Sequence, residues 1–280
     1  MTFELIITPL QLPDALDSAD ATDFHEASAA IDEVKLEIWG NRDRISTPEA
    51  RLTNWRDNEY SQNQMFLGRL DGKLAGYASV HFSLKDNLNT AYLYAAVLPE
   101  HRHRGFGRQL LAKAEQFAAE NGRTVVQSNT EHPSGFPFEG ALVPKPGSGA
   151  LPADSAGVLF AQKYGFELEM VERFSELSVP VSAERLAEFR IASQAKAGSD
   201  YQIVYWHDRV PEEIAEELAK ALTQMTIDMP SAGLEFEVER WDVARLRKSE
   251  KDSLASGQQS FGLAAMHAPT GEVAAYTYIH

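Results

Sequence analysis

Residues 101–108 read HRHRGFGR and place three arginines, two histidines and two glycines in eight positions. The chain around them is acidic, with 26 Lys and Arg against 41 Asp and Glu. A strand-like run, AYLYAAV, precedes the segment at 91–97, and an amphipathic helix is predicted to follow it. The first main-chain N–H groups of a helix lack internal partners and carry partial positive charge. The segment is therefore predicted to bind an anion, most naturally a phosphate.

Two common phosphate motifs do not fit this segment. A P-loop needs Gly-Lys-Ser/Thr, whereas Gly107 is followed by Arg108 and Gln109. A dinucleotide fingerprint needs a third glycine where Leu110 stands, and the strand predicted after the helix does not end in an acid. The alternative to a phosphate site is a solvated basic helix start with a glycine turn.

Composition narrows the class of protein. The 280 residues suffice for one large domain or two ordinary ones, and 44% of them are hydrophobic. Cysteine is absent, which excludes disulfides and a cysteine nucleophile and favours a cytoplasmic location. The N-terminal residues match neither a signal peptide nor a membrane span, and no metal-ligand spacing stands out. The net charge of −15 argues against nucleic acid and favours a cationic substrate, with plain solubility as the alternative.

The elements that position the basic segment follow from periodicity and turn signals. Helices are predicted at 17–39, 47–57, 107–121, 154–164 and 182–196, with Thr47 and Ser182 as N-caps. Strands are predicted at 3–8, 65–70, 74–82, 91–97 and 124–128, with two more short strands inside 166–179. A long Gly- and Pro-rich stretch at 132–152 reads as an irregular loop.

The second half of the chain repeats the first. GKLAGYASVH at 72–81 aligns without gaps to GEVAAYTYIH at 271–280, and a strand and two helices are predicted before each hairpin. The second copy stops at His280, before any counterpart of 91–97, so we expect one anion site per chain and a chain cut from a longer one. The expected domains are 1–180, a helix and linker at 181–200, and a partial second copy at 201–280.

The pattern Val97-x-Pro99-x-x-Arg102-x-x-Gly105-x-Gly107 resembles the acyl-CoA motif of the GNAT superfamily of N-acetyltransferases. The order of the predicted elements and the sequence FAQKYGF at 160–166 are similar to that family as well. The resemblance covers 1–180 fully and 201–280 only as the front half of a second domain. It implies an α/β (α+β) GNAT fold: a mixed, mostly antiparallel central sheet flanked by helices, plus a partial second copy.

The resemblance also implies a chemistry. Acetyl-CoA would donate the acyl group, and its pantetheine arm would lie along the main chain of Ala96, Val97 and Leu98. Its pyrophosphate would be held by the segment from Arg104 to Gln109, that is by Arg104, Gly105, Phe106, Gly107, Arg108 and Gln109, with Arg102 or Arg104 pairing with phosphate. A main-chain N–H would polarise the thioester carbonyl, and the amine would attack directly, without an acyl-enzyme.

The sequence departs from the family at the positions of the general acid and the general base. The family's usual tyrosine in the late helix falls at Ala161. Tyr164 is the candidate acid in its place, or it packs at the helix end. His81 is the candidate base, or a structural histidine, and Glu131 and His132 are further candidates.

We therefore expect an acetyl-CoA-dependent N-acetyltransferase that acts on a primary amine of a small molecule or peptide. The acidic charge favours a cationic acceptor. The alternative function is a non-catalytic acyl-CoA-binding or sensing protein. In a third hypothesis, the second half of the chain serves only to complete the first domain or a dimer interface. A homodimer is therefore a further possible partner state. We expect no metal, no nucleic acid and no membrane partner.

Overall fold

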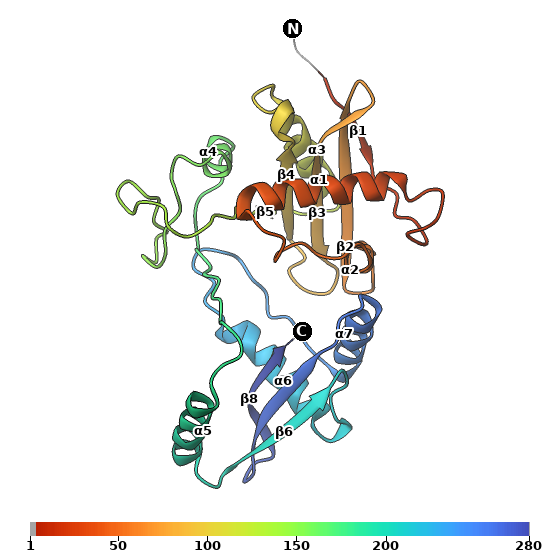
Figure 1. The fold of residues 1–280 in the computed structure, drawn as a ribbon. Coiled ribbons are helices and arrows are strands. Elements are labelled where there is room, and N and C mark those ends of the chain that lie inside the picture. Colours follow the sequence, from red (N-terminus) through yellow and green to blue (C-terminus); the bar gives the residue numbers. More distant parts are fainter. Residues whose placement is uncertain (1–3, 280) are drawn as a thin grey trace. The chain divides into compact units, whose positions relative to one another are not determined.

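The computed structural model describes residues 4–279, which form two compact units (Figure 1). The first unit runs up to Val171 and includes the separate segment Ser231–Glu239. The second unit comprises Glu172–Pro230 and the residues from Arg240 onward. This division follows packing, and the functional boundaries expected after residues 180 and 200 stay a prediction.

The first unit is built around a five-stranded sheet of order β1-β2-β3-β4-β5. Neighbouring strands are antiparallel except for the parallel pair β4 and β5, which confirms the expected mixed, mostly antiparallel sheet. The strands are β1 (Ile6–Pro9), β2 (Ser61–Leu70), β3 (Lys73–Ser83), β4 (Thr90–Val97) and β5 (Val125–Gln127). The helices are α1 (Thr22–Trp39), α2 (Pro48–Trp55), the 3-10 turn η1 (Pro99–His101), α3 (Phe106–Glu120) and α4 (Ala156–Lys163).

Helices α1 and α3 cover opposite faces of this sheet (Figure 1). The predicted apolar stripe of α3 packs on one face, where it meets the inward side chains of β3 and β4: Ala78, Val80, Phe82, Ala91 and Leu93. The apolar residues of α1 pack on the other face, against Leu67 and Tyr77. Thr47 accepts a hydrogen bond from the Ala50 N–H at 3.2 Å, so it caps α2 as expected.

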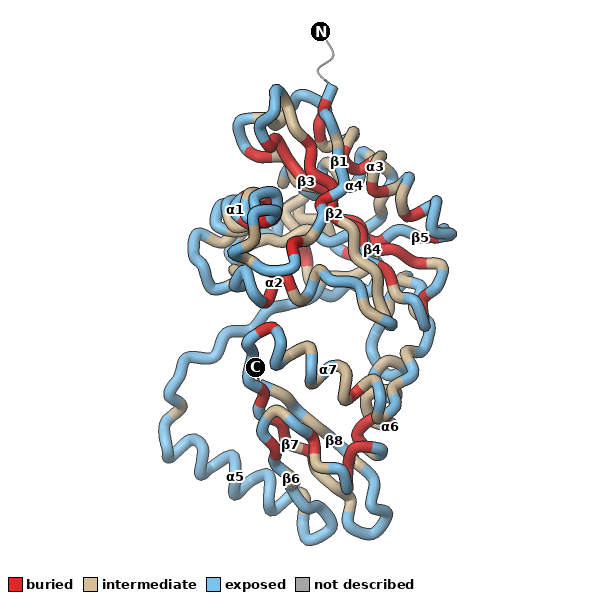
Figure 2. Tube along the Cα trace, turned by 90° about the vertical axis from the view of Figure 1, so that its right-hand side faces the viewer, coloured by how far each residue is buried: buried red, intermediate tan, exposed pale blue. Residues whose placement is uncertain are grey.

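The second unit is a smaller copy of the same order of elements. Its strands form a sheet of order β6-β7-β8, with β6 (Tyr201–His207), β7 (Phe261–His267) and β8 (Glu272–Ile279). Its helices are α5 (Ala183–Ala197), α6 (Glu212–Asp228) and α7 (Val243–Ala255). No residue of α5 is buried (Figure 2), whereas α6, α7 and the sheet share one core around Trp206 and Leu218.

A β-bulge supports the duplication independently of the sequence alignment. In the first unit the register shifts beside Gly68, and Ala75 is left without a partner across β2. In the second unit the register shifts beside Ala265, and Ala274 is left without a partner across β7. Ala75 and Ala274 occupy the same position of the aligned repeat. Bulges persist within families as structural features, so the shared bulge supports a common origin of the two hairpins.

The two short strands expected within 166–179 do not form. Phe166 packs against the first unit's core, but the residues after Val171 have no strand assignment. Phe174, Leu177 and Val179 are exposed. The alternating pattern of this segment finds no neighbouring strand to complete its main-chain hydrogen bonds, so it remains irregular.

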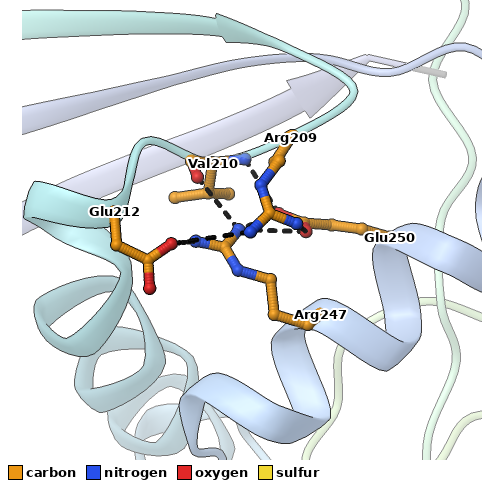
Figure 3. A network of polar contacts seen from close by, with 5 residues as sticks. All are labelled: Arg209, Val210, Glu212, Arg247 and Glu250. Atoms are coloured by element: carbon orange, nitrogen blue, oxygen red, sulfur yellow. Dashed lines mark hydrogen bonds and ion pairs between the residues drawn. The ribbon is translucent and has the colours of Figure 1, made fainter.

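A polar network joins α7 to the turn between β6 and α6 (Figure 3). The Arg247 guanidinium donates to the carbonyl of Val210 at 2.9 Å and to Glu250 Oε1 at 2.9 Å. It also donates to Glu212 at 2.6 Å, and Glu250 Oε1 accepts from the Val210 N–H at 2.8 Å. Arg247 and Glu250 are only 17% and 12% exposed, so this pair is largely desolvated.

We expect Glu250→Ala to destabilise the second unit by about 2 kcal/mol, because it leaves the Val210 N–H without its acceptor and removes one of the two carboxylates that pair with the mostly buried Arg247 guanidinium. Glu216→Ala on α6 is the control, since Glu216 is 80% exposed and pairs with Lys220 at 3.6 Å. Urea unfolding followed by amide exchange in β6, β7 and β8 isolates this unit from the first. Equal shifts in the two variants would show that the network adds nothing to stability.

Candidate functional site

Strands β4 and β5 form a fork in the first unit. They pair in parallel from Thr90 opposite Val125 to Tyr92 opposite Gln127. There β5 ends, while β4 continues to Val97. Among residues 4–279 no further strand pairs with this edge of β4. Main-chain groups along the rest of β4 are therefore available to an extended ligand.

Strand geometry decides which main-chain groups face into the fork. The Leu98 N–H donates to the carbonyl of Ala75 on β3 at 2.9 Å. Because successive residues of a strand direct their N–H and C=O groups to opposite edges, Ala96 also faces β3. The groups of Leu93, Ala95 and Val97 face the fork instead. Ala96, Val97 and Leu98 were expected along the ligand, but of these only Val97 faces the fork. The geometry adds Ala95, which also faces the fork. The alternation of strand residues could have identified Ala95 from the sequence.

The basic segment lies at the open end of this fork. The turn η1 leads from β4 into it, and two residues adopt left-handed conformations, His103 at φ 60° and Gly105 at φ 85°. Gly105 is the N-cap of α3, and no side chain caps this helix end. The N–H groups of Gly105, Phe106, Gly107 and Arg108 precede the first helical hydrogen bonds, so they are available to an anion.

The two glycines of the basic segment are required for different structural reasons. No heavy atom lies within 4 Å of a Cβ built on Gly105, so this glycine is needed for its backbone angle and faces open space. A Cβ on Gly107 would meet the Phe160 ring of α4 at 2.9 Å. Gly107 therefore allows α4 to pack against the start of α3, a role that the sequence pattern attributes to a ligand.

The arginines of the segment are engaged to different degrees. Arg102 donates to the carbonyl of Val97 at 2.9 Å and to both carboxylate oxygens of Glu37. The hydrogen bond with Arg102 lowers the pKa of Glu37. Arg104 is exposed and donates to the carbonyl of Glu100 at 3.2 Å. A phosphate would have to displace Glu37 to reach Arg102, so Arg104 is the more accessible cation.

The next two side chains of the segment serve the fold. Arg108 pairs with Glu115 at 2.9 Å. The Gln109 side chain accepts from the Leu5 N–H at 2.9 Å, which ties the residue before β1 to α3. Any contribution of Arg108 to anion binding is therefore through its main-chain N–H, whereas the Gln109 N–H already donates to the Gly105 carbonyl at 3.4 Å.

His81 lies in the row of residues where the fork opens. It pairs with Asn63 on β2 and with Tyr92 on β4, and Tyr92 pairs with Gln127 at the end of β5. His81 alternates with the buried Val80 and Phe82, so its ring is on the α1 side of the sheet. His81 therefore lies on the face of the sheet that α3 does not cover.

The Asn63 amide fixes the proton of the His81 ring. Asn63 Nδ2 donates to the carbonyl of Arg56 at 3.4 Å, which turns Oδ1 toward His81 Nδ1, 2.8 Å away. Because Oδ1 can only accept, Nδ1 carries the proton and Nε2 keeps the lone pair. His81 keeps an exposed surface, but partial desolvation lowers its pKa, so the neutral, basic form prevails at neutral pH.

The profile of the acetyltransferase (GNAT) family matches residues 30–134, which include the fork, the basic segment and His81. The chain carries a GNAT acetyltransferase domain. This match supports an acyl-CoA-dependent acetyltransferase activity for the domain, as the resemblance implied. No curated protein matches the sequence at a significant level.

Solved structures share the GNAT fold. A tandem GNAT protein from the clavulanic acid biosynthesis pathway superposes with a TM-score of 0.63 at 21% identity, over 98% of this chain and 74% of that one. This likeness confirms the fold, including its partial second copy. An aminoglycoside acetyltransferase from an uncultured soil metagenomic sample, in complex with sisomicin, reaches a TM-score of 0.43 at 18% identity, over 62% of this chain and 97% of that one. A putative acetyl transferase from Pyrococcus furiosus reaches 0.40 at 17% identity, over 62% and 100%.

Tyr164 lies at the end of α4 in the first unit. Its ring is half-buried, packs on Phe160 with ring centroids 4.7 Å apart, and lies beneath the Arg108 guanidinium at 5.2 Å. The ring thus joins α4 to the first turn of α3, next to the free N–H groups at the start of that helix. Its role as the acid stays a prediction.

The other two candidate bases, Glu131 and His132, already form hydrogen bonds with neighbouring residues of the protein. Glu131 accepts hydrogen bonds from Lys35 and, at 2.7 Å, from the Trp39 indole, both on α1. Burial acts to raise the pKa of Glu131, but these hydrogen bonds outweigh it and the pKa is lowered. His132 contacts the Thr130 hydroxyl at 2.9 Å. Glu131 thus anchors the loop after β5 to α1, which makes it a poor proton acceptor.

Residues 4–279, which the structure describes, contain no group of three His, Asp or Glu side chains arranged for a metal ion. Within the same residues, no helix has the length and apolar character needed to traverse a bilayer.

Proposed function

We propose that the first unit transfers an acetyl group from acetyl-CoA to a primary amine by direct attack. The observation that carries this proposal is the fork between β4 and β5, with the uncapped start of α3 at its open end. The thioester of the donor supplies an activated acyl group. The N–H groups of residues 105–108 bind its pyrophosphate, and Ala95 and Val97 bind its pantetheine arm through their main chain.

The amine reaches the fork from the α1 side, where His81 lies. His81 Nε2 takes the proton of the attacking ammonium, while Asn63 holds the ring in the required tautomer. A main-chain N–H of β4 facing the fork stabilises the developing oxyanion. The nitrogen–carbon bond forms as the carbon–sulfur bond breaks, and the nitrogen's second proton leaves to solvent. Tyr164 donates a proton to the leaving thiolate and regains one from solvent. The chain's net charge of −15 supports a cationic small molecule or peptide as acceptor.

Calorimetric titration with acetyl-CoA tests this proposal, followed by a thiol-release assay over a panel of amines. We expect one acetyl-CoA per chain and turnover with at least one cationic amine. Absence of binding would overturn the proposal.

A second function, acyl-CoA sensing without turnover, is favoured by one observation. Ala161 stands where the family usually has a tyrosine, and Tyr164 is packed between Phe160 and Arg108. Tight acetyl-CoA binding with no thiol release over the whole panel would establish the sensor.

Replacing Tyr164 with phenylalanine separates its chemistry from its packing. The variant keeps the ring contacts but lacks the hydroxyl, so we expect kcat to fall about 100-fold with acetyl-CoA affinity unchanged. Stopped thiol-release assays at saturating donor measure kcat. An unaltered kcat would assign Tyr164 to packing alone.

A further inference from the structure

The segment Ser231–Glu239, hereafter the brace, belongs to the first unit although it lies between α6 and α7 of the second. The Glu237 N–H donates to Asn87 Oδ1 at 2.6 Å, and Asn89 Nδ2 donates to the Glu235 carboxylate at 3.2 Å. Gln127 Nε2 donates to the main-chain carbonyl of Glu235 at 3.5 Å. The brace therefore touches both the start of β4 and the end of β5.

These contacts surround the closed end of the fork. Asn87 and Asn89 come just before β4, and Gln127 is the residue at which β5 ends and the fork opens. Asn87 is buried, and its left-handed backbone at φ 50° directs the side chain toward the brace. The Glu237 N–H and Asn87 Oδ1 thus form a partly buried hydrogen bond between segments far apart in sequence.

Few other contacts hold β5 in register. It is three residues long and lies at the edge of the sheet. The carbonyl of Asn89 accepts from the N–H groups of Thr124 and Val125, at 2.8 and 2.9 Å. Arg123 donates to the carbonyls of Leu88 and Ser83. A strand this short with one paired edge opens readily, so the brace adds a substantial share of its fixed contacts.

We propose that the brace is a positioning element of the acetyl-CoA fork. By tying Asn87 and Gln127 together, it fixes the point at which β4 and β5 separate, and so the width available to the pantetheine arm. This inference rests on the proposed function, because it assumes that acetyl-CoA binds in the fork. It makes donor binding by the first unit depend on residues from the second half of the chain.

Two substitutions at Asn87 test this role in the full chain. Asn87→Gly keeps the left-handed backbone but removes the acceptor for the Glu237 N–H. Asn87→Asp keeps both the backbone preference and an acceptor oxygen, so it is the matched control. Amide exchange is read at 124–127, which is distant in sequence from the substituted residue. Acetyl-CoA Kd, KM and kcat are measured on the same preparations.

For Asn87→Gly we expect exchange at 124–127 to quicken about tenfold and the KM for acetyl-CoA to rise about tenfold, the size of one net hydrogen bond. The kcat at saturating donor should stay within about twofold, and Asn87→Asp should restore both readouts. Unchanged exchange, or quickened exchange with an unchanged KM, overturns the positioning role. A wild-type protein that binds no acetyl-CoA overturns the proposed function instead, and the exchange result still shows whether the brace holds β5.

Discussion

Replacing Gly105 with glutamate is expected to abolish acetyl-CoA binding while the first unit stays folded. Gly105 has φ 85° and faces open space, so a side chain meets no protein atom and costs about 1–2 kcal/mol of backbone strain. A carboxylate at this N-cap would itself accept from the free N–H groups of α3 and favour the helix dipole. The same carboxylate would occupy and repel the pyrophosphate. We expect affinity to fall about 100-fold or more by calorimetry.

The other end of the same helix provides the control. Gly122 follows α3, has φ 75°, and likewise has no heavy atom within 4 Å of a built Cβ. Gly122→Glu therefore carries the same added charge and a similar backbone cost, away from the fork. It should bind acetyl-CoA as the wild type does. Normal affinity in Gly105→Glu would show that the pyrophosphate lies elsewhere.

Replacing His81 with glutamine is expected to lower kcat/KM by about 100-fold to 1000-fold, the usual range for a positioned base. Glutamine can still hydrogen-bond to Asn63 but cannot take the proton. Because the basic form of His81 is the neutral one and its pKa is lowered, wild-type activity should rise with pH through a limb below 6.5, the ordinary histidine value. That limb should vanish in the variant.

His132→Gln is the matched control for this prediction, since His132 follows β5 and contacts Thr130. It should keep both the rate and the acidic limb. If His81→Gln retains the wild-type pH profile, His81 is a structural histidine and the amine loses its proton to another group. If His132→Gln loses the limb instead, the base lies on the loop after β5.

Local patterns predicted most of the first unit and the position of the basic segment between β4 and α3. The apolar stripe of α3, the Thr47 cap and the turn between β2 and β3 all depend on residues close in sequence, and each occurs as predicted. The basic segment could be placed between strand and helix for the same reason.

Contacts between distant residues could not be predicted. Glu37 neutralises Arg102 from 65 positions away, and Phe160 explains Gly107 from α4. The brace meets Asn87 across 150 positions. Composition and periodicity carry no information about such pairings. The strands expected within 166–179 failed for a related reason, because a strand depends on a neighbour that local pattern does not specify.

The path of the chain bears on how the protein can be dissected. It passes from the first unit to the second after Val171, back at Ser231, and out again after Glu239. A fragment ending at Val171 would therefore lack part of its own fold, and a protease cut after Pro230 or after Glu239 would leave the two units covalently linked. The duplicated halves are thus no longer separable modules. Gene fragments designed at the apparent repeat boundary would encode an incomplete enzyme.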